Sequence, residues 1–163
     1  MNQPTQSELL QKEYALSLLH KTNTRIYISG PISGYPDLNA LAFTAAEVKL
    51  KQLELVPVNP LLITDFSVYK DPLSPIEQWV IAMKADLKEM FGCGALYMLD
   101  NWQKSIGASW EFLNAKMLKI PCFSLDFELI TLTEAEYIDL FYNTIKNIKL
   151  HDQLINQTFN TKG

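Results

Sequence analysis

The sequence contains few of the residues from which disulfides and metal sites are built. Its 163 residues include only two cysteines and two histidines. Cys93 and Cys122 lie in apolar runs without CxxC spacing, so we predict buried, reduced thiols. His20 and His151 lie near opposite ends of the chain. We therefore expect no metal site, and a histidine-based catalytic triad is disfavoured.

The sequence also lacks an excess of positive charge and any long apolar run. Its formal net charge is −4 at pH 7, which argues against a surface for nucleic acid polymers. Backbone amides can still bind a small anion without Lys or Arg. No apolar run approaches the roughly 20 residues of a membrane helix, and the N-terminal segment does not resemble a signal peptide. We expect a soluble, cytoplasmic protein that binds no membrane.

Apolar strand-like segments alternate with amphipathic helical segments between residues 25 and 125. The predicted strands cover residues 25–30, 54–60, 95–99 and 121–125. The helices between them begin near residues 40, 74 and 105. This alternation predicts an α/β fold in which helices cover both faces of a parallel sheet.

Two further helices are expected outside this core, at residues 7–20 and 133–150, with a polar tail after the second. The whole chain of 1–163 is predicted to be one domain with its core at 25–125. Ser74, with Glu77 three residues later, predicts a helix start with a capping box. Asp37 or Asn39 is expected to cap the preceding helix.

Ligands of parallel α/β sheets bind at the carboxyl ends of the strands, in the loops that lead into helices. The loops of interest are therefore 30–39, 59–74 and 99–111. Two carboxylates, Asp86 and Glu111, fall at the edges of apolar helical stripes, where each could face a cleft. Asp86 could equally be a structural acid, and Glu111 a helix-start acid stabilised by the helix dipole.

The loop before the last core helix could bind an anion. Ser105 and Gly107 precede the helix body, where free amides and a close backbone approach are available. An ordinary serine cap with a glycine turn is the alternative. Tyr27 and Trp102 could stack on a base, although aromatic residues at such positions also form core.

Three segments together resemble the nucleoside 2-deoxyribosyltransferase superfamily, in particular a group of short phage and bacterial proteins. The segments are YISGPISG, MKADLKEM and LDNWQKSIGASWEFLNAKMLKIP, within residues 25–125. The resemblance implies a flavodoxin/Rossmann-like three-layer sandwich with a parallel sheet. It also implies cleavage of an N-glycosidic bond and assembly as a homodimer or higher homo-oligomer.

Residue by residue, the resemblance implies that Glu111 attacks the anomeric carbon and that Asp86 positions or protonates the base. Ser105 and Gly107 match the 5′-monophosphate hydrolases of the superfamily, whereas the transferases have an aspartate at the position of Ser105. Eight residues are then expected to bind the substrate: Tyr27, Gly30, Pro31, Ile32, Gly34, Trp102, Ser105 and Gly107.

The expected ligand is thus a small nucleotide or nucleoside, and no metal or organic cofactor is required. Hydrolysis of a nucleoside 5′-monophosphate is the first hypothesis. A deoxyribosyltransferase and a non-catalytic nucleotide-binding module are the alternatives. The resemblance names neither the base nor the sugar.

Overall fold

The computed structural model describes residues 5–21, 24–65, 67 and 72–160. Its sheet has four parallel strands, β1 (Arg25–Ser29), β2 (Val56–Val58), β3 (Ala95–Met98) and β4 (Cys122–Phe123), in the order β2-β1-β3-β4. The predicted parallel sheet is therefore confirmed. In the sheet, β2 lies beside one edge of β1, and the next strand of the chain, β3, lies beside the opposite edge of β1. This reversal creates a topological switch point between the carboxyl ends of β1 and β3, where such folds bind ligands.

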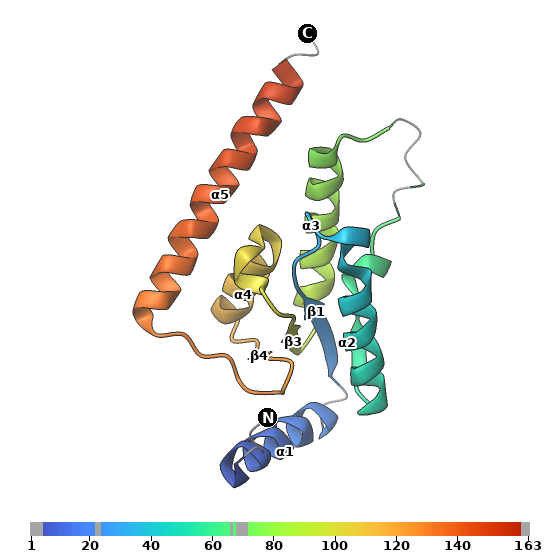
Figure 1. Ribbon diagram of the computed structural model, residues 1–163, viewed down its shortest axis with the longest axis vertical. Coiled ribbons are helices and arrows are strands. Elements are labelled where there is room, and N and C mark those ends of the chain that lie inside the picture. Colours follow the sequence, from blue (N-terminus) through green and yellow to red (C-terminus); the bar gives the residue numbers. More distant parts are fainter. Residues whose placement is uncertain (1–4, 22–23, 66, 68–71, 161–163) are drawn as a thin grey trace.

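Helices cover both faces of the sheet (Figure 1). One face carries α2 (Ala40–Gln52), and α1 (Gln6–Lys21) joins the same apolar cluster from the end of the sheet where β1 begins (Figure 1). The other face carries α3 (Pro75–Phe91) and α4 (Ile106–Met117). Successive side chains of β1 point to opposite faces of the sheet. Ile26 and Ile28 pack in the cluster with α1 and α2, whereas Tyr27 packs in the cluster with α3 and α4. The result is the flavodoxin/Rossmann-like three-layer arrangement predicted from the sequence.

The start of α3 follows the predicted capping box. The Glu77 amide donates to Ser74 Oγ at 3.3 Å, and the Ser74 amide donates to Glu77 Oε2 at 2.7 Å. Pro75 occupies the first helical position, where the missing N–H costs nothing. This helix therefore begins where the sequence predicts.

The start of α2 differs from the prediction. Neither Asp37 nor Asn39 caps this helix through its side chain; instead Asn39 Nδ2 donates to the carbonyl of Pro31 at 2.9 Å. The backbone of Asp37, Leu38 and Asn39 is left-handed, with φ of 48°, 56° and 61°. The helix is thus preceded by the short 3₁₀ turn η1 (Pro36–Asn39), and η2 (Pro60–Leu62) and η4 (Trp102–Lys104) are similar turns.

Both terminal helices are present, and the second is longer than predicted. The C-terminal helix α5 (Glu134–Asn160) continues through the segment predicted as a polar tail, so that prediction was wrong at this end. The helix packs on α4 at its start and extends beyond the rest of the chain (Figure 1). A capping interaction at Thr133 and Glu136 starts it. Polarity alone does not distinguish an exposed helix from an irregular tail, which explains the error.

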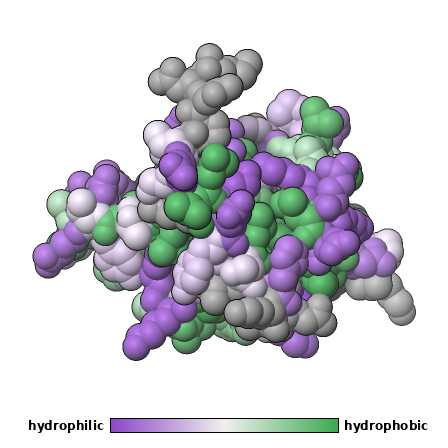
Figure 2. Space-filling model, turned by 90° about the horizontal axis from the view of Figure 1, so that it is seen from below, coloured by the Kyte–Doolittle hydropathy of each residue, from purple (hydrophilic) through white to green (hydrophobic). Residues whose placement is uncertain are grey.

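The surface at the end of the molecule that carries α1 mixes apolar and hydrophilic side chains (Figure 2). Leu9, Leu10 and Tyr14 of α1 are exposed. No helix in the described part of the chain has the length and apolarity of a membrane span. Cys93 and Cys122 are buried free thiols, as predicted.

The capping box makes a stability prediction. Replacing Ser74 by Ala removes the acceptor of the Glu77 amide and should lower the free energy of unfolding by about 1 kcal/mol. Urea denaturation would measure the loss. Ser7→Ala, an exposed change inside α1, is the matched control and should be neutral or slightly stabilising. Equal effects of the two changes would contradict the capping role.

Candidate functional site

A cavity of about 320 Å³ lies at the switch point, between the loop after β1, helix α3 and the start of α4. This volume falls at the lower end of the range for small-molecule sites. Six of the ten residues predicted for the site line it: Gly30, Ile32, Asp86, Ser105, Gly107 and Glu111. We call it the acidic cavity after its two carboxyl groups, Asp86 and Glu111. The loops 30–39 and 99–111 contribute to it as predicted, but no described residue of 59–74 does.

Glu111 is held by two hydroxyl groups from β1. Tyr27 Oη donates to Glu111 Oε1 at 2.8 Å, and Ser29 Oγ donates to Oε2 at 2.5 Å. Tyr27 and Ser29 are two residues apart on one strand, so both side chains face α4. Only 5% of Glu111 is exposed. Each carboxyl oxygen of Glu111 is thus oriented by one hydrogen bond from β1.

Asp86 faces the same cavity from α3 and is 6% exposed. Its Oδ1 atom is buried and has no hydrogen-bond partner among the described residues. A buried polar atom without a partner is costly, and a ligand group that supplied one would be stabilised there. The structure therefore contains a buried acid whose hydrogen-bonding capacity is unused.

Burial raises the pKa of both acids. The pKa of Asp86 rises to about 7 because the carboxyl group is desolvated. The pKa of Glu111 rises to about 8, chiefly through desolvation and further through the charge of Asp86, whereas the hydrogen bonds from Ser29 and Tyr27 lower it. Burial also raises the pKa of Tyr27, which keeps its hydroxyl protonated as a donor. Two acids with pKa values near neutrality in one cavity are characteristic of catalytic sites.

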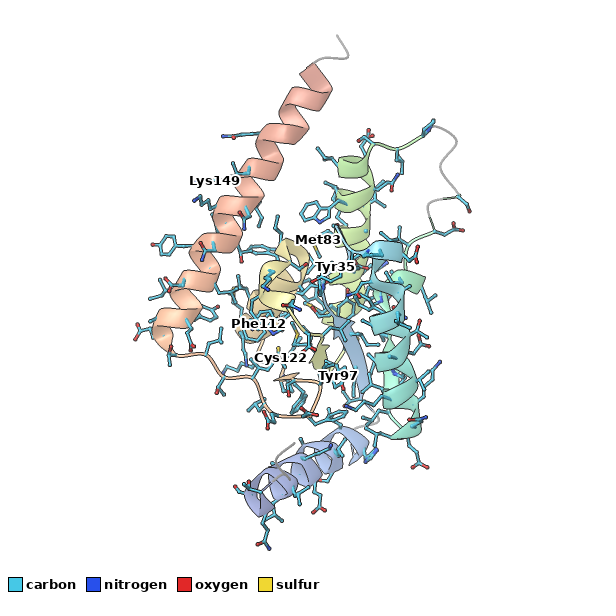
Figure 3. The ribbon with its side chains drawn as sticks, viewed as in Figure 1. Tyr35, Met83, Tyr97, Phe112, Cys122 and Lys149 are labelled. Atoms are coloured by element: carbon cyan, nitrogen blue, oxygen red, sulfur yellow. The ribbon has the colours of Figure 1, made fainter. Side chains whose placement is uncertain are left out.

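The N-terminus of α4 opens beside these acids. Ser105 is the N-cap, and its Oγ accepts the Ala108 amide at 3.3 Å. The amides of Ile106 and Gly107 precede any intrahelical acceptor. A Cβ atom at Gly107 would lie 3.6 Å from the sulfur of Met83, and Met83 points from α3 toward α4 (Figure 3). A side chain at this position would thus make an ordinary van der Waals contact with Met83, and Gly107 lines the cavity with its backbone.

Four predicted site residues do not line the acidic cavity. Trp102 is buried against Phe112, with ring centroids 4.3 Å apart, so it belongs to the core and is not placed to stack on a base. Tyr27 is fully buried and acts as a hydrogen-bond donor to Glu111. Pro31 is buried and bonded to Asn39, and Gly34 is exposed with φ of 82°.

Gly30 lines the acidic cavity and has a structural role as well. A Cβ atom there would lie 2.8 Å from the side chain of Leu99. Gly30 thus lets β1 and β3 end close together, in addition to lining the cavity with its backbone.

The sequence prediction missed several residues at this site. The most important is Ser29, which directly bonds Glu111. Its signal was the spacing Tyr27-x-Ser29 in a buried strand, which places two hydroxyls on one face. The remaining missed residues give the cavity its apolar and amide walls: Ser33, Leu38, Gln78, Trp79, Ala82, Met83 and Ala108. Those on α3 share the helical face of Asp86, at spacings of three, four, seven and eight residues.

Residues 24–123 match a family model described as a domain of unknown function, DUF4406, and the chain belongs to this family. The match covers all four strands and both acids of the cavity. No curated protein matches the chain significantly. No solved structure does so either.

The raised pKa values predict a pH-dependent stability cost. A carboxyl group with a raised pKa binds its proton more tightly in the folded state, so stability is lost as pH rises from about 4.5 toward 8. Glu111→Gln removes this cost while its amide can still bond Tyr27 and Ser29. The melting temperature of the variant should match that of the unmodified protein near pH 4 and exceed it by about 5–10 °C at pH 8.

Thermal denaturation across this pH range would measure the difference. Glu128→Gln, an exposed change, is the control and should show no comparable trend. A constant offset between Glu111→Gln and the unmodified protein at all pH values would contradict the shifted pKa.

Proposed function

We propose that this member of the DUF4406 family cleaves the N-glycosidic bond of a nucleoside 5′-monophosphate, with Glu111 as the nucleophile. One observation carries the proposal: two buried carboxyl groups with raised pKa values face one cavity beside the open N-terminus of α4. The resemblance of the Ser105, Gly107 and Glu111 segment to the nucleoside 2-deoxyribosyltransferase superfamily supports the same chemistry.

The phosphate is assigned to the N-terminus of α4. Free amides and the helix dipole favour an anion there, and the Ser105 hydroxyl can donate to a phosphate oxygen. The six residues from Ser105 to Glu111 correspond to about 9 Å along the helix. Because helical side chains tilt toward the N-terminus, this spacing accommodates a pentose between the phosphate and the Glu111 carboxylate.

In the first step, a carboxylate oxygen of Glu111 attacks the anomeric carbon of the sugar. A C–O bond forms as the C–N bond breaks, and the electron pair of that bond goes to the base. The hydroxyls of Tyr27 and Ser29 hold the carboxylate in orientation throughout. With a pKa of about 8, Glu111 is ionised in a minority of free molecules at neutral pH, and the reactive form is the one in which Glu111 is ionised and Asp86 is protonated. Positive charge that develops on the sugar favours this form and opposes the effect of burial.

Asp86 is the proposed proton donor to the departing base. Its pKa of about 7 leaves a substantial protonated fraction at neutral pH. A protonated Asp86 can donate a hydrogen bond from its otherwise unused carboxyl group to a ring nitrogen of the base. In the second step, the Asp86 carboxylate takes a proton from water as the water attacks the glycosyl ester, and Glu111 is released.

Loss of the nucleophile should abolish base release. Glu111→Gln preserves the shape of the side chain but cannot form the glycosyl ester, so release should fall by at least about a thousandfold. Mass spectrometry of a panel of deoxy- and ribonucleoside monophosphates and nucleosides would detect free base. Glu128→Gln should retain full activity, and full activity in Glu111→Gln would refute the assignment.

The two acids predict a bell-shaped dependence of kcat/KM on pH. Activity should rise as the pair loses its first proton near pH 7 and fall as it loses the second near pH 8. Asp86→Asn removes the general acid and one negative charge beside Glu111. The remaining activity should be lower and should show one rising limb, with a midpoint below about 8. A second falling limb in this variant would contradict the role of Asp86.

The phosphate assignment predicts an effect of charge at residue 105. Ser105→Asp keeps a good helix cap but places a negative charge at the proposed phosphate position. The ratio of kcat/KM for a monophosphate to that for its nucleoside should fall by at least about tenfold. Ser105→Asn is an uncharged cap of the same size and serves as the control. Equal ratios in the two variants would place the phosphate elsewhere.

A further inference from the structure

A second cavity, also of about 320 Å³, lies between the start of α4 and helix α5. We call it the α5 cavity. Ser105 lines both cavities, whereas Gly107 and Glu111 face the acidic cavity and Ile106 and Ser109 face the α5 cavity. The two cavities therefore flank the first turn of α4 on different sides and meet at its N-cap.

The α5 wall of this cavity is a polar ladder. Glu136, Asp139, Asn143 and Asn147 line it, and their spacings of three and four residues place them on one face of the helix. Gln103 faces them from the turn before α4. The side chains of Gln103, Asp139, Asn143 and Asn147 form no hydrogen bond within the described ranges. These side chains are exposed to solvent, so the cavity presents several hydrated amide and carboxylate groups that a ligand would bind in place of water.

The buried polar groups of the same cavity are already satisfied. Ser109 Oγ donates to the carbonyl of Gln103 at 3.2 Å, and Thr144 Oγ1 donates to the carbonyl of Leu140 at 2.7 Å. Any ligand would therefore be bound by the unpartnered amides and carboxylate and not by these hydroxyls. The side-chain amides of Gln103, Asn143 and Asn147 both donate and accept hydrogen bonds, and the Asp139 carboxylate accepts them. Sugar hydroxyls also donate and accept, so they are suitable partners for these groups.

The charges around the α5 cavity restrict its occupant further. Lys104 is the cation that lines it, and its Nζ donates to Asn101 Oδ1 at 3.0 Å. Glu136 and Asp139 face the cavity from α5. Thr133 donates two hydrogen bonds of 2.8 Å to Glu136 and so lowers its pKa. Beyond Lys104 the wall formed by α5 is acidic, so a further anionic group there would be repelled, whereas an uncharged group would not.

We propose that the α5 cavity is a second subsite, which binds an uncharged, hydroxyl-bearing group joined to the nucleoside through its 5′ phosphate. This inference rests on the proposed function, because it takes a phosphate at the N-terminus of α4 as the point of attachment. Because Ser105 lines both cavities, a substituent on that phosphate would extend from the acidic cavity into the α5 cavity and contact the polar face of α5. The substrate class is then a nucleoside diphosphosugar or a pyrophosphate-linked dinucleotide, with Lys104 beside the second phosphate.

Calorimetric titration of the Glu111→Gln protein would test the subsite without turnover. The probes are two matched series: UMP, UDP and UDP-glucose, and AMP, ADP and ADP-ribose. In at least one series the diphosphosugar should bind about tenfold more tightly than the monophosphate, and the diphosphate should not share this gain. Asn143→Leu and Asn147→Leu should each remove most of the gain and leave binding of the monophosphate unchanged.

Lys149→Leu is the matched control, because Lys149 lies on α5 but points away from the rest of the chain (Figure 3). Light scattering of each variant reports whether a second copy of the chain occupies the α5 cavity instead. A change of oligomeric state in Asn143→Leu, or equal affinities for monophosphate and diphosphosugar, would overturn the subsite. Base release from the monophosphate by the unmodified protein would still support the proposed function in that case.

Preferential binding of the diphosphosugar through Asn143 and Asn147, without base release from any probe by the unmodified protein, would support the subsite and refute the glycosidase activity. Absence of binding by every probe would overturn the subsite, and base release from the wider panel of deoxy- and ribonucleoside monophosphates would then decide the glycosidase activity by itself.

Discussion

The pair of hydrogen bonds from Tyr27 and Ser29 to Glu111 is the interaction on which the site depends. It joins the central strand to α4 through groups with almost no exposure to solvent. Without these donors, a carboxyl group at this depth would have no compensation for its lost hydration. The bonds orient both carboxylate oxygens and so decide which side of Glu111 faces the cavity. The proposed nucleophile is thus positioned by the sheet and not by the helix that carries it.

The topology brings the other parts of the site to the same place. The chain reverses direction across the sheet between β1 and β3, so the loops after these strands diverge and leave a cavity. Gly30 permits the close approach to Leu99 at this point. Helix α3 then adds Asp86 from one side, and the N-terminus of α4 adds free amides from another. The free amides of a helix N-terminus and two acids thereby share one small volume.

This arrangement is costly to the folded state. Both acids have raised pKa values, and Asp86 keeps a buried oxygen without a partner. Neither feature stabilises the fold, because burying an apolar or neutral side chain at these positions would cost less free energy. Such costs persist at sites that bind or transform ligands. The stability lost here is the physical reason to regard the cavity as functional, independently of any resemblance.

The sequence by itself determined the elements of this protein and the two acids. Short continuous apolar runs located the strands of the core and the 3.6-residue period located its helices. The Ser74 capping box marked the start of α3, because these signals are local. Periodicity placed Asp86 and Glu111 at the edges of apolar stripes but left their burial open. Only the tertiary structure decided that Ser29 bonds Glu111, that Trp102 packs on Phe112 and that α5 borders Ser105. Each of these depends on contacts between segments far apart in the chain, and a local pattern contains no information about which distant side chain will be opposite.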